Sequence, residues 1–161
     1  MDPLNLARTA RLLAIPLPFA LAGYSFAFSQ NAVPHLYTTP AEHSTPIFKG
    51  VFNSGAQVVL PGAIFSAAGA AYLAYSIPAQ QRLWATIAVV NVMPLVFTGV
   101  VMMTGIRRLL VIEGDKGKQA RATQSLEVRQ LLKTWVWQNY VRAGLFLVSG
   151  VLAWRAAGGV V

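Results

Sequence analysis

The stretch TWVWQNYVRAGLFLVSGVLAW, residues 134–154, decides what kind of protein this is. It stands between Lys133 and Arg155, and it is long and apolar enough to cross a bilayer as one helix, which needs about 20 residues. One residue in it does not suit lipid. Arg142 lies about 13 Å from the Lys133 end, at the helical rise of about 1.5 Å per residue. The function of the chain therefore depends on what this guanidinium meets.

The composition of the whole chain agrees with a membrane location. Apolar residues form 55% of it, charged residues only 11%, and the mean hydropathy is +0.53. Water-soluble domains have about a quarter charged residues. A length of 161 residues leaves room for about four spans and no separate soluble domain. We therefore expect an all-α membrane protein, a four-transmembrane-helix bundle forming a single membrane domain over residues 1–161.

Hydrophobic segments and turn-forming residues set the expected boundaries. The four spans are predicted at about residues 8–30, 50–76, 83–112 and 125–157, with loops at residues 31–49 and 113–124. The first loop is predicted because HLYTTPAEHSTPIFKG (35–50) combines threonines, prolines and both histidines, which is typical of turns. The second is predicted because EGDKGK (113–118) contains two glycines, which are poor helix formers. Pro61 is expected to kink the second span.

The distribution of basic residues predicts the topology. The net charge is +8, but seven of the thirteen lysines and arginines fall in residues 107–133, where they flank spans. This pattern argues against nucleic acid as a partner and for a lipid bilayer. Eight cations flank the side with both long loops and four flank the other side. The positive-inside bias therefore predicts cytosolic long loops, with both termini across the membrane.

Several classes of chemistry are excluded by what the sequence lacks. The chain has no cysteine, so disulfides, thiolate catalysis and cysteine-ligated metals are impossible. All five acidic residues fall in segments predicted to face water, which argues against a proton relay or a carboxylate di-iron site in the bundle. No flavin or nicotinamide fingerprint is present.

A row of three side chains in the fourth span is the best candidate for a site. Trp135, Asn139 and Arg142 are spaced i, i+4, i+7, which places them on one helix face. Arg142 could simply snorkel or bind carbonyls freed by prolines. Alternatively, the row faces a cavity shared with other polar groups of the spans. Among those groups are Ser29, Asn53 and Thr98.

The two histidines are the other candidates. His35 and His43 are the only imidazoles in the chain, and both fall near the end of the first span. Either can act as a general base near neutral pH or as an axial ligand of haem. The plain alternative is a histidine on a surface loop.

Four segments in order resemble the membrane-bound anthrone oxygenases of aromatic polyketide pathways. They are AGYSFAFSQNAVPHL, TPIFKGVFNSGAQVVLPGAI, MPLVFTGVVMMTGIRRLL and WVWQNYVRAGL, which together cover about residues 20–150. The family pattern of Trp, Asn and Arg falls on Trp135, Asn139 and Arg142. The resemblance implies a monooxygenase-type oxidoreductase of secondary metabolism, which converts a polyketide anthrone to the anthraquinone with O2 through an anthranol anion.

Roles for the candidate residues follow from this resemblance. Arg142 and Asn139 would stabilise the oxyanion, and His35 or His43 would remove the proton. The flat substrate would be held by side chains within the spans, namely Trp135, Asn53, Thr98 and Ser29. For the cofactor, either none or a non-covalent haem b held by His35 or His43 is expected. The expected location is an endomembrane such as the endoplasmic reticulum or vesicles, and a homo-oligomer is left open.

Two other classes are weighed against the oxygenase. One is a small membrane transferase of the glutathione-using type, whose arginine-rich second span and glutamate are missing here. The other is a non-enzymatic membrane assembly protein, in which Arg142 and faces of small residues meet partner helices.

Overall fold

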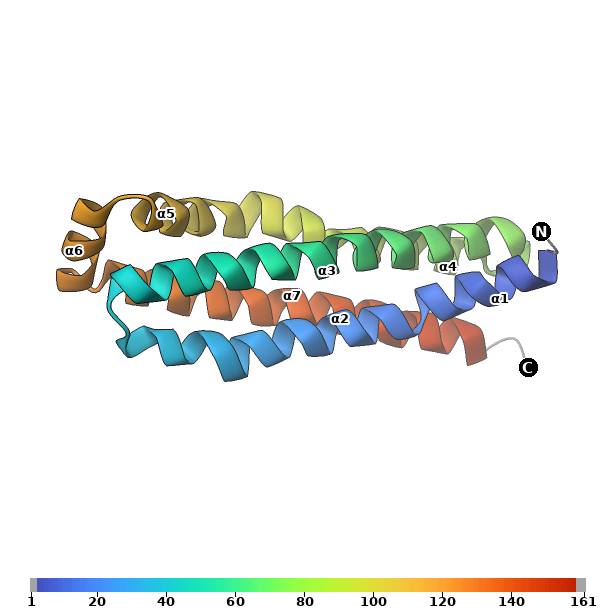
Figure 1. The fold of residues 1–161 in the computed structure, drawn as a ribbon. Helices are drawn as coiled ribbons and strands as arrows, with labels where there is room; N and C mark the ends of the chain where they lie inside the picture. Colours follow the sequence, from blue (N-terminus) through green and yellow to red (C-terminus); the bar gives the residue numbers. More distant parts are fainter. Residues whose placement is uncertain (1–2, 159–161) are drawn as a thin grey trace.

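The computed structural model describes residues 3–158, and within that range it is all-α (Figure 1). Four helical segments are long and apolar enough to cross a membrane, and they run side by side. These are Leu4–Thr38, Ala41–Ser76, Pro78–Glu113 and Glu127–Gly158. The four-span bundle predicted from the sequence is confirmed. Its composition and four spans are those of a multi-pass membrane protein.

The first span consists of several short helical pieces. Helix α1 (Pro3–Ala14) ends before Pro16, which has no N–H to continue the hydrogen-bond ladder. Helix α2 (Pro16–Ala27) follows, and then a π-helical segment, Phe28–Ala32, and a 3₁₀ segment, Val33–Thr38. The chain is therefore helical to Thr38, eight residues beyond the predicted end of this span.

Helix α3 (Ala41–Ser76) corrects the predicted loop at residues 31–49, because residues 41–49 are helical. The prediction weighed the prolines of this segment and missed its buried face. Ala41, Thr45 and Phe48 lie on one side of the helix and are at most 1% exposed, so they pack into the bundle. Burial of this face outweighs the loss of the hydrogen bond that Pro46 cannot donate.

The third span also changes helix type along its length. Helix α4 (Gln81–Phe97) passes into a π-helical segment, Thr98–Met102, and then into α5 (Met103–Glu113). The predicted loop at residues 113–124 is wrong in its greater part, because α6 (Lys116–Gln124) follows after Gly114 and Asp115.

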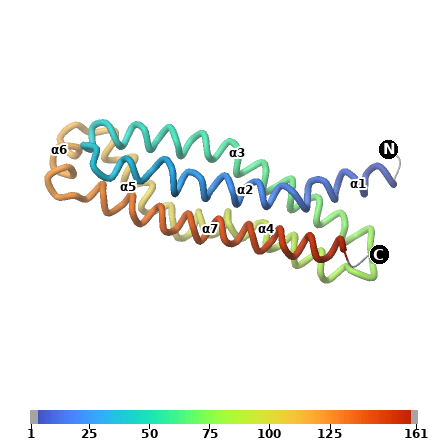
Figure 2. Tube along the Cα trace, turned by 90° about the horizontal axis from the view of Figure 1, so that it is seen from below, coloured from blue at the N-terminus to red at the C-terminus, as the bar shows by residue number. Residues whose placement is uncertain are grey.

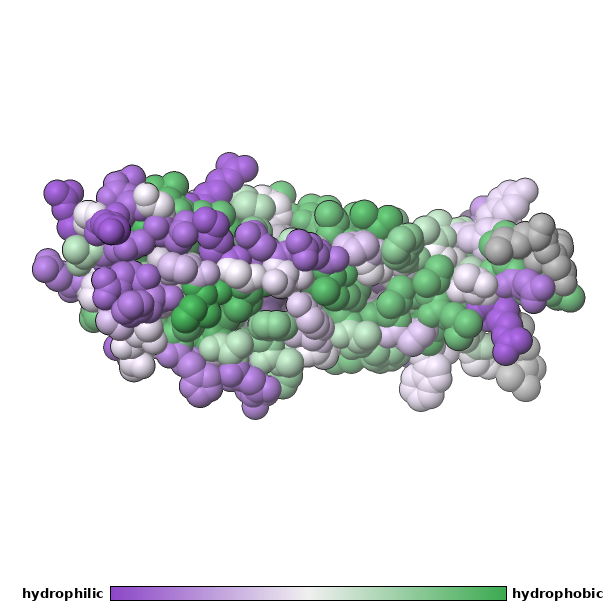
Figure 3. All heavy atoms as spheres, in the orientation of Figure 1, coloured by the Kyte–Doolittle hydropathy of each residue, from purple (hydrophilic) through white to green (hydrophobic). Residues whose placement is uncertain are grey.

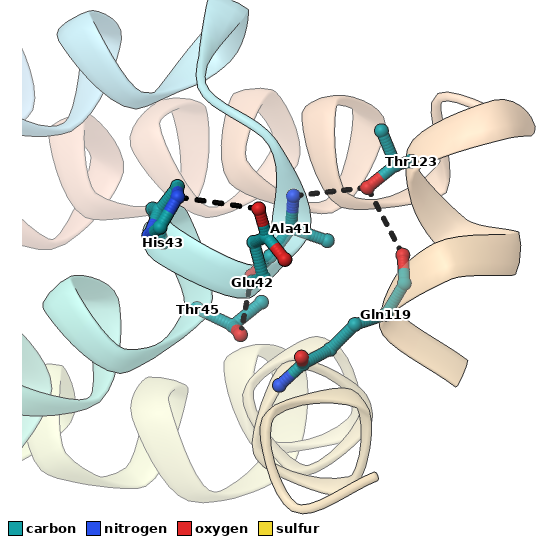
Figure 4. Close-up of polar contacts among 6 residues, drawn as sticks. All are labelled: Ala41, Glu42, His43, Thr45, Gln119 and Thr123. Atoms are coloured by element: carbon teal, nitrogen blue, oxygen red, sulfur yellow. Dashed lines mark hydrogen bonds and ion pairs between the residues drawn. The ribbon is translucent and has the colours of Figure 1, made fainter. Parts of the chain in front are cut away.

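Helix α6 forms because its N-terminus is capped and its side is attached to α3. The Asp115 carboxylate accepts a hydrogen bond from the Lys118 N–H, with Oδ1 and N 3.1 Å apart, and this bond lowers the pKa of Asp115. The Thr123 hydroxyl oxygen accepts one from the Ala41 N–H at 3.0 Å (Figure 4). Since both glycines of EGDKGK lie at or before the first turn of α6, they do not prevent the helix.

Helix α7 (Glu127–Gly158) is the fourth span. Figures 1 and 2 show that the start of α1 and the end of α7 lie together at one end of the bundle, while α6 lies at the other. Hydrophilic side chains gather at both ends and hydrophobic ones cover the middle, as a bilayer requires (Figure 3). The two ends are called below the terminal end and the α6 end.

The spans approach one another closely toward the terminal end. A buried cluster there joins α1, α3, α4 and α7 and contains Leu73, Trp84 and Ile87, all 0% exposed. A Cβ atom added at Gly69 would lie 2.7 Å from the backbone oxygen of Ala10. In the absence of a hydrophobic drive between helices in lipid, such close approach is what holds spans together.

Candidate functional site

A cavity of about 230 Å³ lies between the spans on the α6 side of the bundle. All four spans line it. The residues are Tyr24, Ser25 and Phe28; Val51, Phe52, Gly55, Ala56, Val59 and Leu60; Leu95, Thr98, Gly99 and Met103; and Trp135, Asn139 and Arg142. The walls are mainly apolar and aromatic, and a few polar groups converge in them, which is the usual composition of a small-molecule site.

The mouth of the cavity faces the side of the bundle. Ala56 and Leu60 of α3 and Gly99 of the π-helical segment line it and are exposed, with Leu60 50% accessible. In a bilayer, this mouth opens toward lipid.

The row on α7 predicted from the sequence lines this cavity. Trp135 is 5% exposed, Asn139 is 0% exposed, and Arg142 is partly buried beside them. Side chains of a helix lean toward its N-terminus, which brings the guanidinium of Arg142 down toward the level of Asn139. The row is thus a wall of the cavity and does not reach up to headgroups.

Arg142 has a positive charge with no counter-charge. Within residues 3–158 it makes no hydrogen bond or ion pair, and its Nε atom is buried without a partner. No carboxylate or imidazole lines the cavity. A buried cation costs free energy unless an anion or strong acceptors meet it, so this cavity favours a negatively charged or strongly polar ligand group.

Asn139 is held by a hydrogen-bond network to the first span. Its Nδ2 donates to the Ser25 backbone oxygen at 2.8 Å and to Ser29 Oγ at 2.7 Å. Ser29 Oγ in turn donates its one hydrogen to the Ser25 oxygen at 3.0 Å. These bonds consume both N–H groups of the carboxamide, which leaves Asn139 no donor for a ligand.

Several residues of the lining carry buried polar atoms without a partner. Buried side-chain atoms without a hydrogen bond include Trp135 Nε1, Asn139 Oδ1, Arg142 Nε and Ser25 Oγ, all on residues that line the cavity. Buried polar groups in folded proteins are normally paired, so such a group of unpaired atoms points to a ligand or water. Two of the atoms are donors, one is an acceptor, and the serine hydroxyl can be either.

Both π-helical segments lie beside this cavity. Phe28 begins the first segment and Thr98 and Gly99 begin the second, and all three line it. A π-helical turn inserts a residue into the α-helical register and is frequent at functional sites. Here one such turn follows α2 and the other follows α4.

The two histidines lie away from the cavity. His35 and His43 are exposed, and neither is among the lining residues. His43 Nε2 lies 3.2 Å from Glu42 Oε1 at the start of α3, as Figure 4 shows. Residues 3–158 contain no group of three or more histidine, cysteine or acidic side chains placed to hold a metal ion. Neither histidine therefore lies where it could contact a ligand in this cavity.

The other predicted substrate residues divide in two. Thr98 lines the cavity, with its hydroxyl donating to the Pro94 oxygen at 2.8 Å. Ser29 does not line it but is buried behind Asn139. Asn53 is exposed on the outer face of α3, so the structure does not bring it to this site.

Some lining residues were not predicted, although their helical spacing in the sequence would have indicated them. Ser25 stands four residues before Ser29, and Tyr24 four before Phe28, so each pair shares a helix face. Tyr24 and Phe28 pack together with ring centroids 4.8 Å apart. Gly55 and Gly99 carried no signal, because a glycine in a span is equally typical of close helix packing.

The comparisons with known proteins agree with the resemblance seen in the sequence. Residues 48–152, about two thirds of the chain, match the family model described as anthrone oxygenase. The match includes the row on α7 and the parts of α3, α4 and α5 that line the cavity. No curated protein and no solved structure matches the chain.

Proposed function

The chain belongs to the anthrone oxygenase family, and from this premise we propose that it oxidises an anthrone at its central methylene to the anthraquinone, with O2 as the oxidant. The observation that carries the proposal is the uncompensated cation of Arg142 in an apolar cavity built from all four spans. We expect a polyketide-derived substrate, because its fused aromatic rings suit these walls.

Binding uses the shape and the walls of the cavity. A volume of about 230 Å³ is just below the usual range for small-molecule sites, about 300–1,000 Å³, and suits a flat molecule of a few fused rings. Phe28, Phe52 and Leu95 supply apolar contact to the rings. The oxygen on the central ring is directed to the donors at the row, Trp135 Nε1 and Arg142.

Arg142 makes the substrate reactive by favouring its anion. An anthrone that loses a proton from its methylene becomes an anthranolate, with the negative charge largely on oxygen. An opposite charge within about 4–6 Å lowers the pKa of such a group, and the effect is larger in a site of low dielectric. This stabilisation resembles that of an oxyanion hole, in which donors are placed where charge develops.

The oxidation then needs only O2. The electron-rich carbanion gives one electron to O2, and the resulting radical and superoxide combine, so that a C–O bond forms at the former methylene. Protonation gives a hydroperoxide, whose O–O bond and remaining C–H bond break to release water. The sum is anthrone plus O2 giving anthraquinone plus water, with two electron pairs removed from the substrate.

The sequence predicts His35 or His43 as the group that removes the proton, and the geometry favours a different base. Neither His35 nor His43 lines the cavity, and the lining contains no carboxylate. We propose that water reaching the cavity accepts the proton while Arg142 stabilises the anion left behind. Histidine-to-alanine changes at both positions are therefore expected to leave at least about half of the activity.

We favour the version of this reaction without a cofactor, since His35 and His43 lie outside the cavity. The test is a visible absorption spectrum of the protein purified in detergent, measured together with its activity. A haem band that rises and falls with activity across preparations would overturn this part of the proposal.

The direct test supplies an anthrone to membranes with and without this chain. We expect anthraquinone to form with one O2 consumed per molecule, and to form much faster with the chain than by the uncatalysed oxidation seen in membranes without it. The variant Arg142→Met keeps much of the side-chain volume but removes the charge, so we expect turnover to fall by about a hundredfold or more, as when an oxyanion donor is lost. Normal turnover by this variant would remove Arg142 from the reaction.

A measurement without turnover separates charge from chemistry. An aromatic phenol that changes colour on ionisation is titrated with the protein in nanodiscs. Wild type is expected to bind it as the phenolate at a pH at which the free phenol is neutral, whereas Arg142→Met binds it neutral or not at all. Equal titration curves for the two proteins would contradict the proposed stabilisation of the anion.

A further inference from the structure

The carboxamide of Asn139 has only one orientation that its neighbours allow. The Ser25 backbone oxygen can only accept a hydrogen bond, so the group facing it at 2.8 Å must be Nδ2 and not Oδ1. Ser29 Oγ donates its single hydrogen to the same backbone oxygen. Toward Asn139, the Ser29 hydroxyl can therefore only accept a hydrogen bond. The carboxamide oxygen is thereby turned away from both serines.

That oxygen is fully buried and has no partner. Asn139 is 0% exposed and lines the cavity, and its Oδ1 makes no hydrogen bond within residues 3–158. An unpaired buried acceptor costs free energy, so a ligand that supplies a donor gains by pairing with it. On the same face of α7, three residues further on, Arg142 presents donors only.

We propose that Asn139 is a specificity-determining residue, which accepts a hydrogen bond from a hydroxyl group of the ligand, and that Ser29 is a positioning residue that holds it in this state. The cavity then selects an aromatic ligand with two oxygens of different kinds. One is an acceptor or anion facing Arg142, and the other is an O–H facing Asn139. This inference rests on the proposed function and changes the role of Asn139 from donor to acceptor.

The arrangement rejects related ligands in a defined way. A ligand whose hydroxyl is replaced by a methoxy group presents an acceptor to Oδ1, so two lone pairs face each other and the carboxamide stays unpaired. A ligand lacking the oxygen leaves Oδ1 without a partner. Sites built to bond a hydroxyl discriminate strongly for this reason.

The test measures binding, without turnover, of hydroxyanthraquinones substituted at each ring position, each compared with its methyl ether. For at least one isomer, wild type is expected to bind the hydroxyl form about tenfold or more tightly, which corresponds to about 1.4 kcal/mol. In Asn139→Leu, the ratio for that isomer is expected to fall to about one. If Asn139→Leu keeps the ratio of wild type, or if no isomer is preferred, the inference is wrong.

Ser29 variants give a second readout and protect the test from misfolding. Ser29→Ala frees one N–H of the carboxamide, so we expect the ratio to fall severalfold, and Ser29→Thr should restore it because the hydroxyl returns. Ser149→Ala is the matched control, since Ser149 is equally buried on α7 but lies outside the cavity. A ratio that falls equally in Ser149→Ala, or stays at the wild-type value in Ser29→Ala, would overturn the positioning role.

The outcomes distinguish this inference from the proposed function. Turnover of an anthrone by wild type, together with no hydroxyl preference in binding, would refute the acceptor role alone. A hydroxyl preference that depends on Asn139, in a protein that does not oxidise an anthrone, would refute the proposed reaction alone.

Discussion

Two regions of the bundle use glycine for opposite purposes. Toward the terminal end, a Cβ added at Gly69 would lie 2.7 Å from a backbone oxygen of α1, and one at Gly150 would lie 3.0 Å from the ring of Phe19. Beside the cavity, a Cβ added at Gly55 or Gly99 would meet nothing within 4 Å. The first pair lets helices touch, and the second pair leaves space between them.

This difference shows that a glycine in a membrane bundle can serve either close helix packing or an open cavity. Close packing of the terminal half supplies the van der Waals contact that holds the spans together. The α6 half, in contrast, keeps an open cavity with a buried cation, and such a feature weakens a fold. The following predictions test this division, beginning with the largest expected effect.

Gly69→Leu tests the packed half. Its side chain would have to occupy the position of the α1 backbone at Ala10, so we expect the first span to separate and little folded protein to be recovered. Monodispersity and the unfolding temperature in detergent measure this. The control is Gly144→Leu on the exposed face of α7, where a Cβ would meet nothing within 4 Å. Equal yields of the two variants would show that the terminal half tolerates bulk.

Gly55→Leu tests the open half. The added side chain fills the cavity without meeting backbone, so we expect an unfolding temperature at or above that of wild type, since leucine also favours helix over glycine. Turnover of an anthrone is expected to fall at least about tenfold, or 1.4 kcal/mol in transition-state binding. Unchanged turnover would mean that substrate binds elsewhere. The same Gly144→Leu variant serves as the control.

Arg142→Met tests whether the buried cation beside the cavity lowers the stability of the ligand-free protein. Replacing buried ionic groups by apolar side chains of similar volume is often neutral or stabilises a protein by about 1–4 kcal/mol, and an unpaired cation has no partner to lose. For a chain of this size each kcal/mol raises the unfolding temperature by about 2–4 °C. We expect the ligand-free variant to unfold at a temperature several degrees higher. A lower unfolding temperature would indicate that Arg142 supports the fold.

Ser66→Ala tests a buried hydroxyl that lies outside the cavity. Ser66 is 0% exposed on α3, its hydroxyl has no hydrogen-bond partner, and it lies outside the cavity. We expect the smallest effect here, a change in stability within about 1 kcal/mol and turnover equal to that of wild type. A large loss of turnover would show that the reacting region extends beyond the residues that line the cavity.

Much of the fold could be predicted from the sequence, because hydropathy alone marks segments that must span a membrane. Helices at residues 41–49 and 116–124 were missed for a physical reason. Prolines and glycines signal a turn locally, but Phe48 is stabilised by an edge-on contact with the ring of Trp135, with centroids 5.4 Å apart. Phe48 and Trp135 are 87 positions apart, so this contact cannot be predicted from the local sequence around Phe48.

Of the candidate site, only the row of three side chains on α7 could be predicted, from its helical spacing. The spacing of Trp135, Asn139 and Arg142 places them on one face, and all three line the cavity. The role of Asn139 as an acceptor depends on a backbone oxygen, that of Ser25, which no sequence pattern can identify. His35 and His43 have the chemistry of a general base, but the sequence does not show where α3 begins or which way their side chains face. Both are exposed in the structure, which argues against a role in the cavity.

The exposed mouth formed by Ala56, Leu60 and Gly99 has a consequence for kinetics. A tricyclic aromatic ketone dissolves far better in hydrocarbon than in water, so, under the proposed function, the protein would take up this substrate as a solute of the bilayer. The relevant concentration is then moles per mole of lipid. Adding empty vesicles at constant total substrate should slow the reaction by dilution, even though nothing has changed in the aqueous phase.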